Sequence, residues 1–148
     1  MTKNNQTPKG ELSYYGLSLL SFLKDSHPDR VGNKAFINER ADRAADVYSE
    51  TIKSGLTHIE AEERASAELY RGLHFSPYTL IVNILWDEFS AEIPEDSART
   101  IAMEVLPLCG SVFAKYNLTD DFAETLQHDA LYTELTGTIA ILLEDGTV

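Results

Sequence analysis

Metal binding is the first chemistry to consider in this 148-residue chain, because the chain contains four histidines and histidine is the commonest metal ligand in proteins. A carboxylate-bridged di-metal site uses a Glu three residues before a His, a spacing that brings both ligands to one helix face. No histidine here has an acidic residue three positions before it. His58 and Glu60 resemble the His-x-Glu of zinc deaminases, but that chemistry needs two downstream cysteines and the chain has only Cys109. We therefore expect no metal-binding residues and no cofactor. The four histidines are His27, His58, His74 and His128.

Two acid–histidine pairs have the spacing of one helical turn, His58 with Glu62 and Glu124 with His128. Side chains four residues apart are neighbours on a helix, and such a pair stabilises an exposed helix by roughly 0.2–0.5 kcal/mol. A solvated contact on a helix surface is therefore the simpler interpretation of each pair.

Nucleophilic catalysis would have to use Cys109, which follows Pro107 and precedes Gly110. A reactive thiol needs a base or a helix N-terminus to lower its pKa, and the sequence places no histidine to do so. Free cysteines are among the most buried residues, so we expect Cys109 to be structural. A single cysteine also excludes an internal disulfide.

Catalytic and phosphate-binding motifs are absent from the sequence, including G-x-S-x-G, G-x-x-x-x-G-K-[ST] and G-x-G-x-x-G. The sequence thus predicts a non-enzymatic protein with no catalytic or cofactor-binding residues. The rival hypothesis is an enzyme whose site is assembled from scattered residues. Its candidates are His74, Asp87, Glu88 and Cys109.

The net charge of −12 is unevenly distributed. Residues 1–34 have a balance of +2, residues 35–72 of −3 and residues 73–148 of −11. An acidic surface repels phosphate backbones, so we expect no direct binding of duplex nucleic acid. The negative charge is compatible with two kinds of binding partner: a basic protein surface, or the nucleic-acid-binding site of another protein. Solubility alone would also explain such a charge.

Nucleic-acid binding through the less acidic half has two candidates. Residues 56–73 could imitate a helix-turn-helix, but they contain four glutamates against Arg64 and Arg71, a poor composition for a groove-reading helix. A basic set earlier in the chain is the better candidate, and a solvated helix face explains it equally well. This set is Arg30, Lys34, Arg40 and Arg43.

The elements that would position these residues can be read from apolar periodicity. Residues 1–10 predict a disordered polar tail, and residues 11–148 a single helical domain. A first helix ends before Pro28, because the residue before a proline avoids the helical region. Its apolar positions are Leu12, Tyr15, Leu19, Leu20 and Leu23.

A long second helix is predicted over residues 30–54, with Gly55 as a left-handed cap at its C-terminus. Thr57 and Glu60 then form the T-x-x-E capping box that opens a third helix. The small residues on the buried face of this helix predict close approach to the second helix. The second helix has the stripe Ile37, Ala41, Ala44, Tyr48 and Ile52, and the third has Ala61, Ala65, Leu69 and Leu73.

The most apolar stretch begins at Ser76 and Pro77, a helix cap followed by a proline suited to the first helical position. From Tyr78 to Phe89 the helix is apolar around most of its girth until Asp87. Such a helix is normally buried centrally, so we predict that this segment, Trp86 included, forms the core.

The C-terminal third predicts a fifth helix from about residue 95 to Asn117, kinked or broken at Pro107, with Leu108 in its apolar stripe. Thr119 is expected to cap a sixth helix. Residues 135–148 are β-branched and contain Gly137, so they fit either a short strand or a helix end. The predicted fold class is all-α, a compact bundle of about six helices.

Several segments together resemble a small family of domains of unknown function: "ELSYYGLSLLSFLKDSHPD", "AFINERADRAADVY", "GLHFSPY", "LWDEF", "FAKYNLTDDFA" and "LYTELTGTI". The resemblance covers roughly residues 11–145. It implies a compact helical fold encoded on conjugative and other mobile elements of gut-type anaerobic bacteria, often near large DNA methylase–helicase genes. It implies no activity, cofactor or catalytic residue.

The leading hypothesis is an acidic, non-enzymatic accessory module that binds another protein, such as a DNA-processing enzyme. Mimicry of DNA, which would inhibit a restriction or modification enzyme, is the alternative within this class. A homodimer is expected if part of Tyr78–Phe89 is exposed.

The sequence predicts a cytoplasmic protein without a membrane partner. No stretch reaches the about 20 apolar residues that span a bilayer, and no signal-peptide cleavage site follows Tyr14–Leu23.

Overall fold

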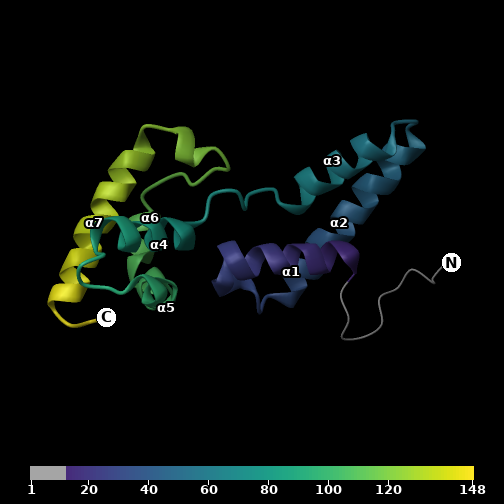
Figure 1. Cartoon of the computed structure of the whole chain (residues 1–148). Coiled ribbons are helices and arrows are strands. Elements are labelled where there is room, and N and C mark those ends of the chain that lie inside the picture. The colour runs from purple at the N-terminus through teal and green to yellow at the C-terminus, as the bar shows by residue number, and fades with distance from the viewer. Residues whose placement is uncertain (1–12) are drawn as a thin grey trace. The chain divides into compact units, whose positions relative to one another are not determined.

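The computed structural model describes residues 13–148 and contains only helices and connecting segments over that range (Figure 1). The all-α prediction is therefore confirmed for the described part of the chain. The tail predicted over residues 1–10, like Leu12, lies outside the described residues. The longer helices are α1 (Tyr14–Ser26), α2 (Lys34–Lys53), α3 (His58–Leu69), α4 (Pro77–Glu88), α5 (Ala98–Val105) and α7 (Gln127–Glu144). The short ones are η2 (Pro28–Arg30), η3 (Glu95–Ser97), η4 (Leu106–Cys109), α6 (Gly110–Phe113) and η5 (Phe122–Glu124).

The chain forms two compact units, which we describe separately. Unit 1 contains the described residues up to Asp25 together with Arg30–Arg71, and unit 2 contains Ser26–Asp29 and Gly72–Val148. The single domain expected over residues 11–148 stays a prediction.

Unit 1 is built on the pair α2 and α3, which pack along each other (Figure 1). Their facing surfaces are lined by alanines, which allow two helix backbones to approach closely, as predicted. Helix α1 joins α3 through the Tyr15 hydroxyl, which donates to Glu62 at 2.8 Å, and through an edge contact of the Phe22 and Tyr70 rings. The buried alanines are Ala41, Ala44, Ala61 and Ala65.

The helix ends of unit 1 follow local sequence chemistry. The Thr57 side chain accepts from the Glu60 amide and the Glu60 carboxylate accepts from the Thr57 amide, which confirms the predicted capping box. Gly55 has φ 92°, the left-handed conformation expected after α2. The second helix begins later than predicted, since Asn33 caps it by accepting from the Phe36 amide at 3.1 Å.

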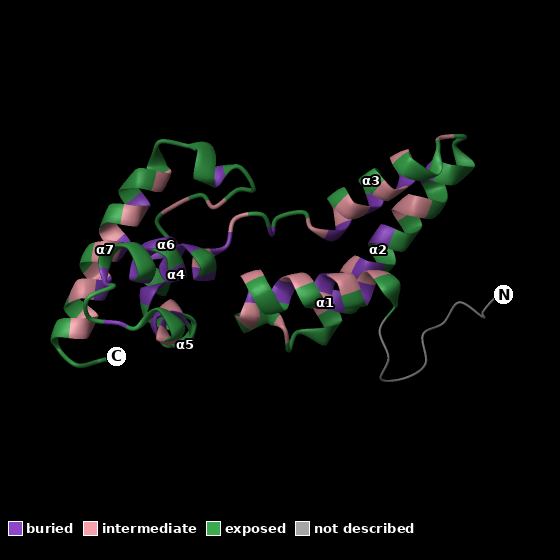
Figure 2. Cartoon of the chain, viewed as in Figure 1, coloured by how far each residue is buried: buried purple, intermediate pink, exposed green. Residues whose placement is uncertain are grey.

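Unit 2 is organised around α4, where buried residues gather in Figure 2. The Ser76 side chain caps this helix and Pro77 occupies its first turn, as predicted. Helices α5 and α7 and the turn η4 pack against α4. The buried residues of α4 are Tyr78, Leu80, Ile81, Val82, Ile84 and Leu85. The prediction that this segment forms the core is therefore correct for most of its length.

Trp86 is the exception on α4, because 37% of its surface is exposed. The prediction that Trp86 lies hidden in the core is wrong. Trp86 lies on the helix stripe of Thr79 and Asn83, which are exposed as well, so the neighbouring elements leave this side of α4 uncovered. The indole thus lies on the solvent side of α4, directly before the exposed acids Asp87 and Glu88.

One further prediction is wrong at the C-terminal end. Thr119 does not open a helix, because its hydroxyl bonds Asp121 and the next long helix starts only at Gln127. Residues 135–148 were predicted to form either a short strand or a helix end, and the helix is confirmed, because residues 135–144 belong to α7 with Gly137 inside it. The break at Pro107 is confirmed by η4, but Leu108 is exposed.

Over residues 13–148 no helix combines the length and the apolar character that crossing a membrane requires.

A matched pair of substitutions on α7 tests the core of unit 2. Leu135 is fully buried and Ile141 is 64% exposed. We expect Leu135→Ala to lower the free energy of unfolding by about 2–5 kcal/mol through lost burial and a residual cavity. Ile141→Ala should change it by less than about 0.5 kcal/mol. Urea unfolding followed by circular dichroism measures both, and equal losses would contradict the assigned orientation of α7.

Candidate functional site

Negative charge is concentrated in unit 2. This unit contains two Lys/Arg and fourteen Asp/Glu, a balance of −12. The described part of unit 1 contains eight Lys/Arg and nine Asp/Glu, a balance of −1. The net charge of the chain therefore resides almost entirely in one unit.

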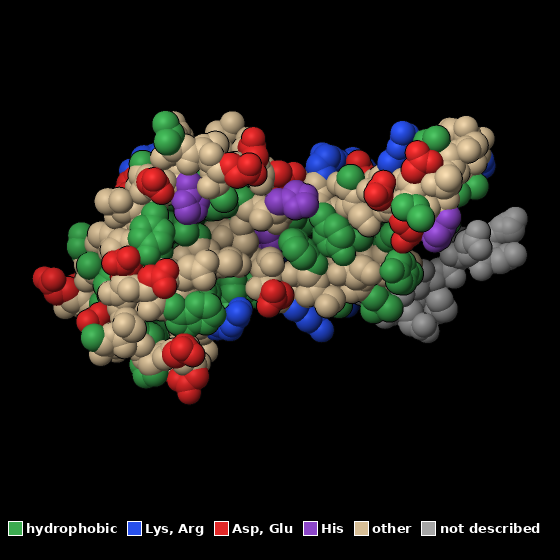
Figure 3. Space-filling model, turned by 45° about the horizontal axis from the view of Figure 1, so that its top comes forward, with side chains coloured by type: hydrophobic (Ala, Val, Ile, Leu, Met, Phe, Trp, Pro, Cys, Tyr) green, Lys and Arg blue, Asp and Glu red, His purple; other side chains and the backbone are tan. Residues whose placement is uncertain are grey.

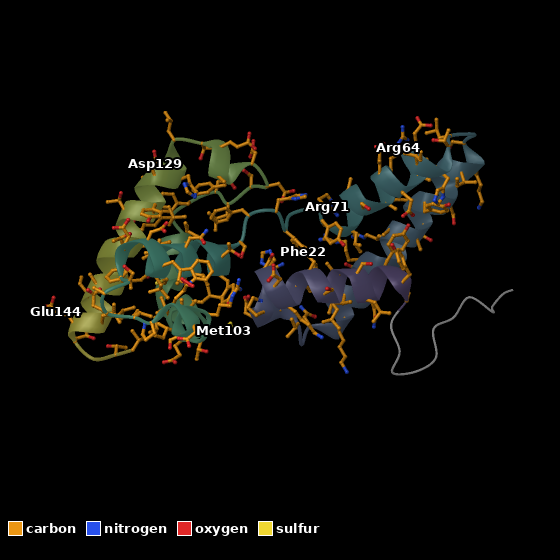
Figure 4. All side chains as sticks on the ribbon, viewed as in Figure 1. Phe22, Arg64, Arg71, Met103, Asp129 and Glu144 are labelled. Carbon is orange, nitrogen blue, oxygen red and sulfur yellow. The ribbon has the colours of Figure 1, made fainter. Side chains whose placement is uncertain are left out.

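The acidic side chains of unit 2 are displayed to solvent. Thirteen of the fourteen are exposed, and Glu134 is half-buried. In the face shown in Figure 3, they are spread over the elements α4–α7 with few basic side chains among them. Figure 4 shows Asp129 and Glu144 near opposite ends of α7, so the charge follows the length of that helix. The result is an extended acidic surface rather than one cluster.

Both basic side chains of unit 2 are already engaged. Lys115 forms an ion pair with Glu134, which also accepts from the Tyr116 hydroxyl at 2.9 Å. The Lys115 ammonium, followed by that hydroxyl, lowers the pKa of Glu134. The guanidinium of Arg99 lies over the Trp86 ring, 5.7 Å from its centroid. Neutralisation of the other carboxylates therefore has to come from outside the unit.

A few acids of unit 2 have structural roles. The Asp120 carboxylate accepts from the backbone amides of Gly72 and His74 at 2.9 and 3.0 Å, which fixes the segment before α4. The Tyr132 hydroxyl donates to Glu88 at 2.9 Å. Desolvation, followed by this carboxylate, raises the pKa of Tyr132 to about 12. These bonds give Asp120 and Glu88 structural roles, but they do not account for the excess of negative charge in unit 2.

A surface pocket of about 410 Å³ lies at the end of α4, lined by Trp86, Glu95, Asp96 and Arg99. The indole Nε1 donates to the Glu95 carbonyl at 3.1 Å, which fixes the ring against η3. Glu95 and Asp96 are both exposed. The pocket therefore combines an aromatic face with two carboxylates and one guanidinium.

A second polar cluster lies in unit 1, where three helices meet. Tyr15 of α1 donates to Glu62 of α3, and Tyr48 of α2 hydrogen-bonds His58 Nδ1 of α3 at 2.5 Å. Burial, followed by the bond to Glu62, raises the pKa of Tyr15. His58 and Glu62 were predicted to contact each other on the helix surface, but each bonds a tyrosine of another helix. The cluster thus ties the three helices together.

The predicted basic face of unit 1 is partly structural. Arg40 donates through Nη1 to the carbonyls of Leu69 and Arg71 at 3.1 and 2.7 Å, and its guanidinium lies 4.9 Å from the Phe36 ring centroid. It thereby caps the C-terminal end of α3, whose last carbonyls have no partner within the helix. Arg43 forms an ion pair with Glu68 at 3.4 Å. Half of the four-residue basic set therefore holds α2 and α3 together.

The four candidates of the scattered-enzyme hypothesis are not brought together by hydrogen bonds. Cys109 is fully buried, Glu88 bonds Tyr132, and the backbone amide of His74 bonds Asp120. Asp87 is exposed on α4. Within residues 13–148, no hydrogen bond or ion pair joins any two of the four. The structure thus provides no geometry for an acid–base pair among them.

Among the described residues, no three His, Cys, Asp or Glu side chains are grouped so that they could hold a metal ion. Glu124 lies in η5 and His128 in α7, so the one-turn spacing predicted for this pair does not apply. The Asp129 carboxylate lies 3.9 Å from His128 Nδ1.

The pocket was not predicted from the sequence. Its lining residues come from α4, η3 and α5, and an irregular segment joins α4 to η3. Only one signal could have indicated it. Trp86 stands directly before two acids, Asp87 and Glu88. A tryptophan at such a boundary often packs one part of its ring against the core and leaves the other part in contact with water.

Comparison with known proteins places the chain in a family. The chain belongs to the family described as a domain of unknown function, DUF1896, whose model matches residues 7–148. Protein PG0816 from Porphyromonas gingivalis, known from a crystal structure, is 43% identical to it, with a TM-score of 0.87. That similarity covers 92% of this chain and 93% of the other. No curated protein matches. The predicted membership of a family of unknown function is confirmed.

The surroundings of Cys109 predict an unreactive thiol. Burial raises the pKa of Cys109, so the thiolate fraction at neutral pH is lower than for a free cysteine. We expect an aromatic disulfide reagent to leave the native protein unmodified and to modify one thiol per chain after unfolding in urea. Rapid modification of the native protein at neutral pH would contradict the structural role and revive the enzyme hypothesis.

Proposed function

We propose that this protein is a non-enzymatic binding module whose unit 2 holds a basic surface of another protein. The observation that supports the proposal is the balance of −12 in unit 2, with thirteen of its fourteen acids exposed and both of its basic side chains engaged. Like charges at this density repel one another, and a cationic partner relieves that repulsion.

Electrostatic attraction of this kind acts mainly on the association rate and on the choice of partner. Exposed charges are screened over about 10 Å at 0.1 M salt, so the interaction should weaken as ionic strength rises. Unit 1, with a balance of −1, contributes little to this attraction. Unit 1 therefore serves as the internal control for the proposal.

A DNA-processing enzyme is the partner we propose, because proteins that bind phosphate backbones present basic surfaces that an acidic surface complements. We place the interaction in the cytoplasm. We also place it in the DNA metabolism of a mobile genetic element, because that is the setting that the family resemblance implies. A homodimer remains a separate prediction.

Charge neutralisation in the two units should have unequal effects. We expect the unit 2 variant to bind a peptide of mixed lysine and arginine residues roughly tenfold more weakly, at a few tenths of a kcal/mol per charge. The unit 1 variant should bind as the parent does. Calorimetric titration at low salt measures both. The unit 2 variant combines Asp87→Asn, Glu92→Gln, Glu104→Gln and Glu124→Gln; the unit 1 variant combines Glu39→Gln, Asp42→Asn, Asp46→Asn and Glu50→Gln.

Two outcomes would contradict the proposal. One is the absence of peptide binding by the parent protein at low salt. The other is an equal loss of affinity in the two variants, which would mean that the acids of unit 2 have no special role.

DNA mimicry is the second candidate, favoured by the spread of exposed carboxylates over unit 2. Cross-linked complexes from the native host should contain a DNA-processing enzyme under either proposal. In a mimic complex, duplex DNA displaces the protein and the enzyme is inhibited at low salt. In an accessory complex, the enzyme keeps its DNA binding. Recovery of no such enzyme would contradict both.

A further inference from the structure

We infer that the pocket at Trp86, Glu95 and Asp96 binds an arginine side chain of the protein partner, and that Arg99 of this chain occupies the same indole face in the free protein. The inference rests on the proposed function. It adds that one pocket on the acidic surface of unit 2 holds one particular side chain of the partner.

The exposure of Trp86 is the first argument. The helix that carries it is otherwise buried on its apolar sides, yet 37% of this residue is exposed. Its only polar atom, Nε1, already donates to the Glu95 carbonyl at 3.1 Å. The indole therefore has no donor left for a ligand, and what it offers is its aromatic face.

The carboxylates beside that face are the second argument. Glu95 and Asp96 line the same pocket of about 410 Å³ and are both exposed. A guanidinium is planar, stacks on aromatic rings and bonds carboxylates through a fork of N–H donors. Tryptophan is the best aromatic partner for such a cation. An ammonium carries the same charge but cannot stack, so the pocket favours arginine over lysine.

Arg99 is the third argument, because it shows that this indole face accepts a guanidinium. Its Cζ lies 5.7 Å from the centroid of the Trp86 ring, and its side chain lines the pocket. Two carboxylates against one guanidinium leave the pocket with a formal charge of −1. The pocket therefore still attracts a cation, but an incoming arginine has to compete with Arg99 for the ring.

The competition can be tested without disturbing the backbone. The Arg99 carbonyl accepts from the Tyr78 hydroxyl at 3.4 Å, and a side-chain substitution leaves that carbonyl in place. Arg99→Gln should therefore empty the indole face while unit 2 keeps its fold. Circular dichroism and urea unfolding of each variant verify this.

The experiment uses the full chain and the emission of Trp86, its only tryptophan. Two peptides of equal length and charge, one of glycine and arginine and one of glycine and lysine, are titrated at low salt. The arginine peptide should change the emission and bind more tightly. The double variant Glu95→Gln/Asp96→Asn should weaken its binding about fivefold to tenfold, and Arg99→Gln should strengthen it by about threefold to fivefold.

The matched control is Glu92→Gln/Glu104→Gln, which removes the same charge from exposed positions outside the pocket lining. Its loss of affinity should be smaller than that of the pocket variant. Equal losses, equal binding of the two peptides, or unchanged or weaker binding by Arg99→Gln would overturn the pocket while leaving the proposed function standing. If neither peptide binds the parent protein, the proposed function itself fails and the pocket with it.

Discussion

Burial of α4 is the constraint on which unit 2 depends. A helix that is apolar around most of its girth has to be covered by other elements, and α5, α7 and η4 provide that cover. The buried residues of α5 and α7 are apolar, whereas Glu104 of α5 and Asp129 and Glu144 of α7 are exposed. On these two helices the packing against α4 and the display of acids are therefore two sides of one arrangement. Trp86 lies on the uncovered side of α4, directly before Asp87 and Glu88.

The two units use their charges differently. In unit 1, Arg40 caps α3, Arg43 and Arg71 bond Glu68, and the tyrosines of α1 and α2 bond side chains of α3. Charges of both signs are thus largely balanced inside that unit, whose described residues total −1. In unit 2 two cations face fourteen acids. This imbalance between the units is the observation from which the proposed binding of a basic partner starts.

What could be predicted from the sequence was local. The capping box of Thr57 and Glu60 and the cap at Ser76 depend on residues three apart, and both formed as predicted. The failures depend on neighbours distant in the sequence. Periodicity identified α4 as apolar but could not show that Trp86 would be left uncovered. It also left residues 135–148 open between a strand and a helix end, and residues 135–144 complete a helix packed on α4. The pocket needs Glu95 and Asp96 placed against the indole by an irregular segment, for which the sequence has no periodic signal.

Quenching of Trp86 fluorescence by ions of opposite charge is the most direct test of the central claim, that a partly exposed indole lies within a negatively charged surface. Caesium and iodide are compared at equal ionic strength in the folded protein, each relative to free tryptophan. The negative local potential should concentrate caesium and exclude iodide, so caesium should quench more strongly relative to its standard. Iodide quenching equal to that by caesium, or no quenching by either ion, would contradict the account.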